Sequence, residues 1–398
     1  MDFRFDRKAE AFRQEIREFV KENIPIGESS TALMEGHADD TWEFAMSIAK
    51  KLSARGWLTI SWPNEYTGLN VSVEERLVFG EETGYWGIPG TSMGVSGIGW
   101  VGPSLLLFGT KAQQEKHLPL IASADSDGVW CTGYSEPDSG SDFASLQTRA
   151  ERQGDSYIIN GQKIWTSEAH RARYCWLAAR TNADVEKKHH GISIIIVDMK
   201  SEGITVRPIP TYYGAHSFNE VFFTNVEVPV DNLVGEENRG WYQLMQSLAM
   251  ERGIALGSSG RTRRILDELI QFARETDLIK KPIIRQKLAD VAVDIQALRV
   301  LAYEAAWKTS QGLTSAYEPS RDKAYNDVIL HKLAAIGNEV LGAYAQLDSL
   351  SPDSKWTKLR GSVQALYHST PGMATAAGTT DTMRNIVGQF GLQLPKSY

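Results

Sequence analysis

Cysteine is scarce in this sequence: among 398 residues only Cys131 and Cys175 occur, and they stand far apart. Two such cysteines fit neither a disulfide framework nor a cysteine-based metal site, and they suit a reducing cytosol. His-Glu-x-x-His and Cys-x-x-Cys are absent, and no Gly-x-Gly-x-x-Gly follows a predicted strand. The sequence therefore gives no support for a zinc-peptidase helix or for a Rossmann site that binds NAD. We expect no bound metal ion.

Long apolar runs and an excess of positive charge are also missing. No stretch reaches the roughly 18 apolar residues of a membrane span, and the first 22 residues alternate charged and apolar side chains without a signal core. The net charge of −7 argues against nucleic acid or an anionic membrane as the main partner. We therefore expect a cytoplasmic protein whose main partner is neither nucleic acid nor a membrane.

The hydrophobic pattern divides the chain into three parts. Apolar residues recur at helical spacing in the first part, as at Phe12, Ile16 and Phe19, and again after residue 240. Between them, short β-rich runs predict a barrel or sandwich of about a hundred residues. We predict an α+β fold with an N-terminal helical domain (1–125), a middle β domain (126–235) and a C-terminal helical bundle (236–398).

Individual elements follow from the same pattern. Asn160-Gly161 stands between two apolar segments, which predicts a hairpin over 156–165 with its turn at this pair. Helices with broad apolar faces are expected to pack as a bundle. The other predicted strands cover 174–179, 191–197, 204–209 and 220–228, and the predicted helices include 42–56, 71–83 and 326–347.

Polar residues between 132 and 167 are suited to a flat, polar, aromatic ligand. Ser135 and Ser167 can supply hydroxyl hydrogen bonds, Trp165 can cover one ring face, and the turn that contains Ser141 can reach a phosphate oxygen. The backbone near Thr132 and Tyr134 can meet the pyrimidine edge of a flavin. The alternative is an ordinary Gly/Ser/Asp turn that precedes a hairpin, and the position of Trp165 favours the flavin.

The spacing of Tyr134 to Asp142 and Lys163 to Ser167 resembles the flavin-binding segment of acyl-CoA dehydrogenases, and the resemblance runs nearly end to end. It implies FAD bound by Thr132, Tyr134, Ser135, Ser141, Trp165 and Ser167, with Thr379 and Asp381 as weaker candidates. Further segments that resemble the family are 107–110 with Gln114, 118–119, 218–223 with 228–229, Gly378-Thr379 and Arg384-Asn385.

Enzymes of this family remove the proton α to a thioester while a hydride leaves the β carbon for flavin N5. Many members place the basic Glu two residues before the Thr of the Gly-Thr pair, where this chain has Ala377. Isovaleryl-type members place it in a Glu-Arg pair on the first long C-terminal helix, and Glu251-Arg252 stands at the matching point. The resemblance therefore implies Glu251 as the base, with Asp381 as the fallback. A solvated ion pair on a helix surface is the alternative reading of Glu251 and Arg252.

The resemblance also implies partners. The substrate is an acyl-CoA, contacted by Arg252, Ser141 and Arg384; the expected electron acceptor is electron-transfer flavoprotein, and the expected assembly is a homo- or heterotetramer. Residues 274–280 lack the Arg-x-x-Phe-Gly run by which many members reach the FAD of a neighbouring subunit. Such divergence is commoner in bacterial members that act on branched, cyclic or steroid side-chain acyl-CoAs.

Three other functions stay open on the sequence. The scaffold can serve a flavin oxidase or monooxygenase. The missing C-terminal Glu favours a non-catalytic partner subunit of a hetero-oligomeric dehydrogenase, which the intact set of Ser135, Trp165 and Ser167 opposes. A helical binding protein with a β insert is the third.

Overall fold

The computed structural model describes residues 5–24, 41–91, 97–212, 216–253, 256–313, 317–348 and 355–395. The chain divides into two compact units. The helical unit comprises Met1–Glu35, Val71–Ile88 and Arg252–Tyr398, and the β unit comprises Gly36–Asn70 and Pro89–Glu251. Both units are therefore built from segments that are distant in sequence. The three-domain division at residues 125 and 235 stays a prediction.

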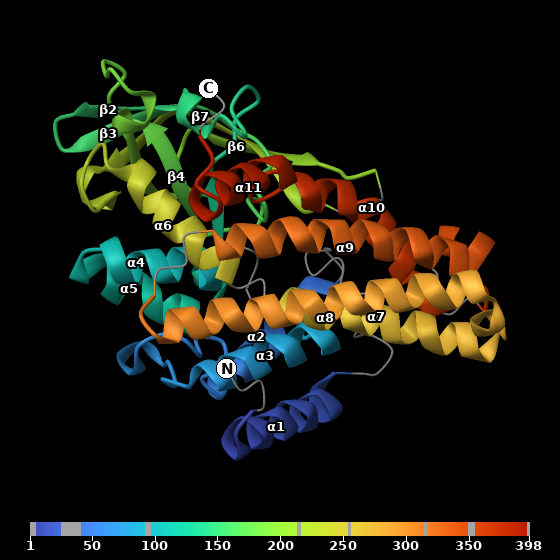
Figure 1. Cartoon of the computed structure of the whole chain (residues 1–398). Coiled ribbons are helices and arrows are strands. Elements are labelled where there is room, and N and C mark those ends of the chain that lie inside the picture. Colours follow the sequence, from blue (N-terminus) through green and yellow to red (C-terminus); the bar gives the residue numbers. More distant parts are fainter. Residues whose placement is uncertain are drawn as a thin grey trace. The chain divides into compact units, whose positions relative to one another are not determined.

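Long amphipathic helices make up the helical unit (Figure 1). Several begin with strong caps: Asp6 accepts a hydrogen bond from the Ala9 amide, and Ser72 and Glu75 form a capping box. Its α-helices are α1 (Arg7–Asn23), α3 (Val73–Trp86), α7 (Leu256–Glu275), α8 (Pro282–Ser310), α9 (Glu318–Leu341), α10 (Ser362–Thr375) and α11 (Thr380–Ile386).

The core of this unit lies between α7, α8, α9 and α10. Each helix contributes apolar side chains at three-to-four spacing, as Leu266, Leu269 and Ala273 do from α7. Leu269 and Leu333 are completely buried. The bundle expected from the sequence is confirmed, although α9 spans Glu318–Leu341 and not the predicted 326–347.

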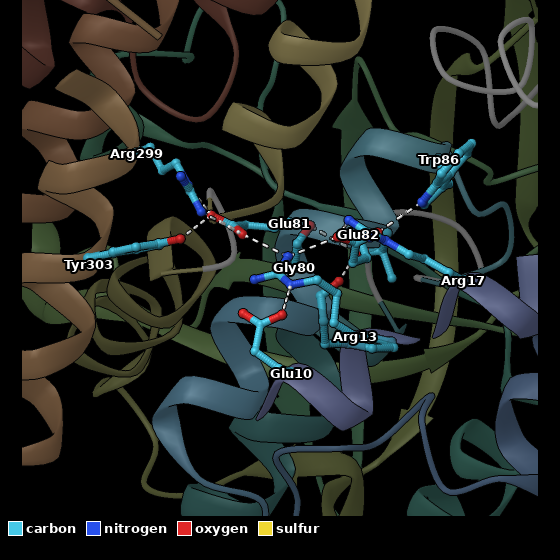
Figure 2. Close-up of polar contacts among 11 residues, drawn as sticks. Glu10, Arg13, Arg17, Gly80, Glu81, Glu82, Trp86, Arg299 and Tyr303 are labelled. Atoms are coloured by element: carbon cyan, nitrogen blue, oxygen red, sulfur yellow. Dashed lines mark hydrogen bonds and ion pairs between the residues drawn. The ribbon is translucent and has the colours of Figure 1, made fainter. Parts of the chain in front are cut away.

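A buried cluster of charges joins α1, α3 and α8 (Figure 2). The Glu82 carboxylate accepts from Arg13 Nη1 at 2.8 Å, from Arg17 Nε at 3.0 Å and from Trp86 Nε1 at 2.9 Å. The neighbouring carboxylate of Glu81 pairs with Arg13, Arg299 and Tyr303. Because both carboxylates are buried, their charges depend on these donors.

The β unit contains one mixed sheet of eight strands. Their order is β6-β7-β3-β2-β4-β5-β8, and β1 runs parallel to β4. The strands are β1 (Trp130–Gly133), β2 (Arg149–Gln153), β3 (Ser156–Lys163), β4 (Tyr174–Arg180), β5 (Ile192–Asp198), β6 (Ile204–Ile209), β7 (Phe218–Pro229) and β8 (Leu233–Val234). The α-helices of this unit are α2 (Trp42–Ala54), α4 (Gly102–Phe108), α5 (Lys111–Ala122) and α6 (Gly240–Gly253), of which the last two residues belong to the helical unit.

Strands β4 and β5 are buried on both faces, which explains why they read as continuous apolar runs. On one face Trp176 and Ile194 join a core with Leu105 of α4 and Leu118 of α5. On the other face Leu177 packs in a second core, together with side chains of β3 and β7. This double burial makes β4 and β5 the rigid centre of the unit.

The predicted hairpin turn at Asn160-Gly161 is wrong. Strand β3 runs through this pair. The turn lies earlier in the chain, between β2 and β3, where Gln153 pairs with Ser156 around Gly154. Gly161 instead sits at an irregularity in the β3–β7 pairing, with φ +153°. A Cβ atom there would lie 2.5 Å from Thr148 Oγ1. Glycine is therefore required by a bulge and a close approach, and not by a turn.

The remaining strands lie within two residues of the predicted ends. Among the described residues, every helix is too short or too polar to cross a membrane. Helices and a mixed sheet in one chain confirm the α+β class.

Candidate functional site

Two segments distant in sequence meet at the candidate flavin site in the β unit. The first comprises the end of β1, with Thr132, and the residues after it, Tyr134 and Ser135. The second follows β3 and carries Trp165 and Ser167. The Ile164 amide donates to the Ser135 carbonyl at 2.9 Å. This hydrogen bond holds the two segments side by side.

The first segment makes a tight turn after Ser135. Glu136 and Ser139 exchange two backbone hydrogen bonds, at 2.9 and 3.1 Å, and the Ser139 hydroxyl donates to the Asp142 carbonyl. Ser141 lies exposed at this turn. Its hydroxyl is therefore presented to solvent, where a phosphate oxygen can be reached.

Trp165 sits on an unusual backbone. Its φ is +58°, a left-handed conformation that is costly for a bulky residue, and Glu168 has φ +61°. The indole is 56% exposed and stands edge-on to Phe218, with ring centroids 6.0 Å apart. A large apolar ring held outward on a strained turn is suited to cover one face of a flat ligand.

The hydroxyl groups of this site fit a polar cofactor. Within the described part of the chain, no hydrogen bond is made by the hydroxyls of Ser135, Ser141 or Ser167. The Thr166 hydroxyl oxygen is buried and likewise has no partner among those residues. Available hydroxyls beside an outward indole match the chemistry of an isoalloxazine ring and its phosphates.

Asn219 of β7 holds the strained turn in place. Its carbonyl accepts from the Thr166 amide at 3.0 Å, and its Nδ2 donates to the Thr166 carbonyl at 3.1 Å. The same amide group contacts His170 Nδ1 at 3.2 Å and His216 Nε2 at 2.9 Å, and the two imidazoles stack with centroids 4.1 Å apart. Asn219 is completely buried. Asn219 thus holds both the N–H and the carbonyl of Thr166.

We expect Asn219→Ala to loosen this turn and to weaken FAD binding about tenfold or more, because a buried carbonyl loses its donor at a cost of roughly 1–3 kcal/mol. Fluorescence titration of the apoprotein with FAD measures the affinity. Glu227→Gln is the matched control, since Glu227 lies on the same strand but is exposed and bonds only the Ser156 hydroxyl among described residues. Equal affinities for both variants would show that Asn219 has no positioning role.

Sequence reasoning missed the buried polar residues behind this site. Lys163 and Glu136 form an ion pair next to Tyr134, and Asn219 holds the backbone of Thr166. The available signal was period-two alternation: Lys163 follows Tyr157 and Ile159 on the inward face of β3. A lysine at an inward position requires a buried partner.

Three of the predicted residues, Thr379, Asp381 and Arg384, lie on α11 or at its N-terminal cap in the helical unit. Thr379 caps α11, where its hydroxyl accepts from the Thr382 amide at 3.1 Å. Asp381 is 86% exposed at its side chain and pairs with Arg384 at 3.2 Å. Thr379 therefore has a structural role, and Asp381 is far more hydrated than a general base needs to be. Their contribution to a cofactor or substrate site stays a prediction.

Glu251 and Arg252 belong to α6 by their backbone. Their side chains lie outside the described residues, so the predicted roles of both stay predictions.

Comparison with known proteins identifies the fold. The N-terminal, middle and C-terminal domain models of acyl-CoA dehydrogenases match residues 6–125, 131–226 and 238–392. Two curated relatives from Mycobacterium tuberculosis are each 32% identical: acyl-CoA dehydrogenase IpdE1, over 97% of this chain and 98% of its own, and acyl-CoA dehydrogenase FadE26, over 100% of both.

Solved structures of similar proteins also resemble this chain over its full length. The Tcur3481-Tcur3483 steroid ACAD superposes with a TM-score of 0.89 at 32% identity, and the ChsE4-ChsE5 complex from Mycobacterium tuberculosis with 0.86 at 32%, each over 100% of both chains. FAD is the expected cofactor of such proteins, which agrees with the hydroxyls and indole of the β unit. The matches cover the whole length of the chain, and it therefore belongs to the acyl-CoA dehydrogenase family and is an enzyme of that family.

Proposed function

We propose that this enzyme carries out FAD-dependent α,β-dehydrogenation of an acyl-CoA thioester and passes the electrons to an electron-transfer flavoprotein. The observation that carries the proposal is the cradle formed by Ser135, Trp165 and Ser167, joined by the Ile164–Ser135 hydrogen bond. Its hydroxyls and indole are available for a ligand, and its backbone is held by buried contacts. FAD bound there supplies the hydride acceptor.

The residues of this chain bind and orient the reactants. Ser135 and Ser167, with the backbone of Thr132 and Tyr134, hold the polar edge of the flavin, and Trp165 covers its face and excludes water. Ser141 reaches toward a phosphate oxygen at the exposed turn.

Glu251 takes the α-proton of the thioester. Its position in α6, next to Arg252, resembles the placement of the base in isovaleryl-type members. Arg252, Arg384 and Ser141 contact the CoA portion of the substrate, and Thr379 and Asp381 contribute at the C-terminal segment. A carboxylate that is partly desolvated by substrate has the basicity that this step requires.

We infer a bulky acyl group, of the branched, cyclic or steroid side-chain class. The inference is supported by the steroid ACAD among the solved relatives, at 32% identity over the full chain. Ala377 at the position where many family members carry Glu agrees with this class.

A hetero-oligomeric assembly is supported by the ChsE4-ChsE5 complex among the same relatives. In such an assembly this chain is either the catalytic subunit or a partner that binds FAD without performing chemistry. The Ala377 position favours the second candidate, and the intact flavin cradle favours the first.

Anaerobic reduction of the flavin tests the proposal. Purified protein is expected to be yellow and to bleach when mixed without oxygen with a branched, cyclic or steroid side-chain acyl-CoA, and to bleach more slowly with straight-chain acyl-CoAs. Yellow protein that no member of the panel bleaches would indicate the partner-subunit role. Rapid reoxidation of the bleached protein by oxygen would indicate an oxidase or monooxygenase.

A further inference from the structure

A buried ion pair lies next to the backbone of Tyr134 and Ser135 in the candidate flavin site. The Lys163 Nζ donates to Glu136 Oε1 at 2.8 Å and to the Tyr134 carbonyl at 3.0 Å. Lys163 is completely buried and Glu136 is 8% exposed. Both charges therefore lie inside the β unit, a few atoms from the backbone that is expected to meet the cofactor.

Gly133 of β1 lies beside the stem of Lys163 and close to two side chains of β4. A Cβ atom on Gly133 would lie 3.4 Å from Lys163 Cγ, 2.7 Å from Leu177 Cδ1 and 3.1 Å from Cys175 Sγ. A side chain at Gly133 would therefore collide with Leu177 and crowd Cys175, whereas the stem of Lys163 lies at ordinary contact distance from this position. The ammonium group emerges at the Tyr134 carbonyl, where β1 ends.

Glu136 is held as a fixed counter-ion. Besides Lys163, its carboxylate accepts from the amides of Gln147 at 2.6 Å and Thr148 at 2.8 Å. Burial alone would raise the pKa of Glu136, but the Lys163 ammonium and these amides bring that pKa below its ordinary value. The carboxylate is therefore ionised at neutral pH.

A buried pair of this kind adds little net stability, because apolar side chains of similar volume pack as well without the cost of desolvating two charges. Its placement suggests what it does instead. The peptide unit between Tyr134 and Ser135 has its carbonyl bonded to the ammonium, and within the described residues its N–H, that of Ser135, donates to no acceptor. A cation at the carbonyl polarises the whole amide and strengthens its N–H as a donor.

We propose that Lys163 is a positioning residue that polarises the Tyr134–Ser135 peptide toward the pyrimidine edge of FAD, with Glu136 as the counter-ion that keeps it in place. This inference rests on the proposed function, since it requires FAD at this cradle. Reduction adds electrons to the flavin ring, so a polarised donor at this edge stabilises the reduced form more than the oxidised form.

The midpoint potential of bound FAD tests the inference, measured by dithionite titration without acyl-CoA. In Lys163→Met the positive charge is lost, so the potential is expected to become more negative and the affinity for FAD to fall about 10- to 100-fold. Burial lowers the pKa of Lys163 and the Glu136 carboxylate raises it, so Glu136→Gln is measured at mildly acidic pH, where the lysine stays protonated without its counter-ion. There the positive charge remains, and the potential is expected to stay the same or become more positive. A merely structural pair would move both potentials in the same direction, because either change loosens the segment.

Lys188→Met is the matched control. Lys188 belongs to the same unit but is 69% exposed at its side chain, so the potential of that variant is expected to equal that of the unmodified protein. An unchanged potential in Lys163→Met, or a negative shift of similar size in Glu136→Gln, would overturn the inference. If Lys163→Met does not fold, Lys163→Gln, which keeps a donor without the charge, is expected to show the same negative shift.

The outcome is separable from that of the proposed function. FAD that binds and titrates normally but is not bleached by any acyl-CoA removes the dehydrogenase proposal and leaves the two shifts measurable. A chain that binds no FAD removes both.

Discussion

Replacing Glu251 by glutamine is expected to leave FAD bound while reduction of the flavin by acyl-CoA slows about 10⁴-fold, the upper end of what a positioned general base contributes. An amide has nearly the shape of a carboxylate but cannot accept the α-proton. The cradle residues around Ser135 and Trp165 belong to other segments, so cofactor binding does not depend on this change. Stopped-flow bleaching under anaerobic conditions measures the rate, and the flavin absorption spectrum reports the occupancy.

Asp381→Asn is the matched control, because it is the same chemical change at the other candidate carboxylate. Asp381 is well hydrated and pairs only with Arg384 among described residues, so its loss is expected to change the rate by less than about tenfold. The reverse pattern, with a slow Asp381→Asn and a normal Glu251→Gln, would transfer the role of base to α11. Normal bleaching in both variants would exclude both carboxylates.

The second large effect is expected from Glu82→Gln in the helical unit. This change leaves Arg13, a buried cation, without one of its two buried carboxylate partners, and it weakens the bonds from Arg17 and Trp86. Breaking a buried ion pair costs about 3–5 kcal/mol. Because the cluster joins α1 to α3, we expect the free energy of opening α1 to fall by that amount, measured as faster hydrogen exchange of its backbone amides.

Glu339→Gln serves as the control for this effect. Its ion pair with Lys287 is nearly half exposed on both sides, so its loss is expected to leave exchange in α1 and α9 almost unchanged. Similar protection of α1 in both variants would show that the buried cluster does not hold that helix.

The same cluster predicts a pH dependence. Burial alone would raise the pKa of Glu82, but hydrogen bonds from Arg17, Arg13 and Trp86 lower it below its ordinary value of 4.5. A depressed carboxylate pKa stabilises the folded state above the ordinary pKa, and that stability is lost as pH falls through the lower, folded-state value. Protection of α1 is therefore expected to decline below about pH 4.5 in the unmodified protein and to depend less on pH in Glu82→Gln.

Much of the fold could be predicted from the sequence because its signals are local. The stripe Leu266, Leu269 and Ala273 has the period of a helix, and β4 and β5 read as apolar runs because both faces are buried. The Asn160-Gly161 prediction failed because the same dipeptide serves a turn and a bulge. Thr148, which directly precedes the neighbouring strand β2, decides between them.

The candidate site divides in the same way. Ser135, Trp165 and Ser167 could be proposed from the sequence, because a hydroxyl or an indole belongs to the residue itself and needs no structure to be recognised. Asn219 and Glu136 are not, because their function lies in what they contact across the sheet.

The sequence by itself determined the family, the order of helical and β segments, and the hydroxyls and indole offered to a cofactor. Tertiary structure alone decided how those groups are held: which carbonyl the Lys163 ammonium meets, which residue clamps the turn of Trp165, and which carboxylates share the buried arginine. The physical reason is that side-chain chemistry and local periodicity are properties of neighbours along the chain. Burial and electrostatic pairing depend on residues that only folding brings within a few ångströms of one another.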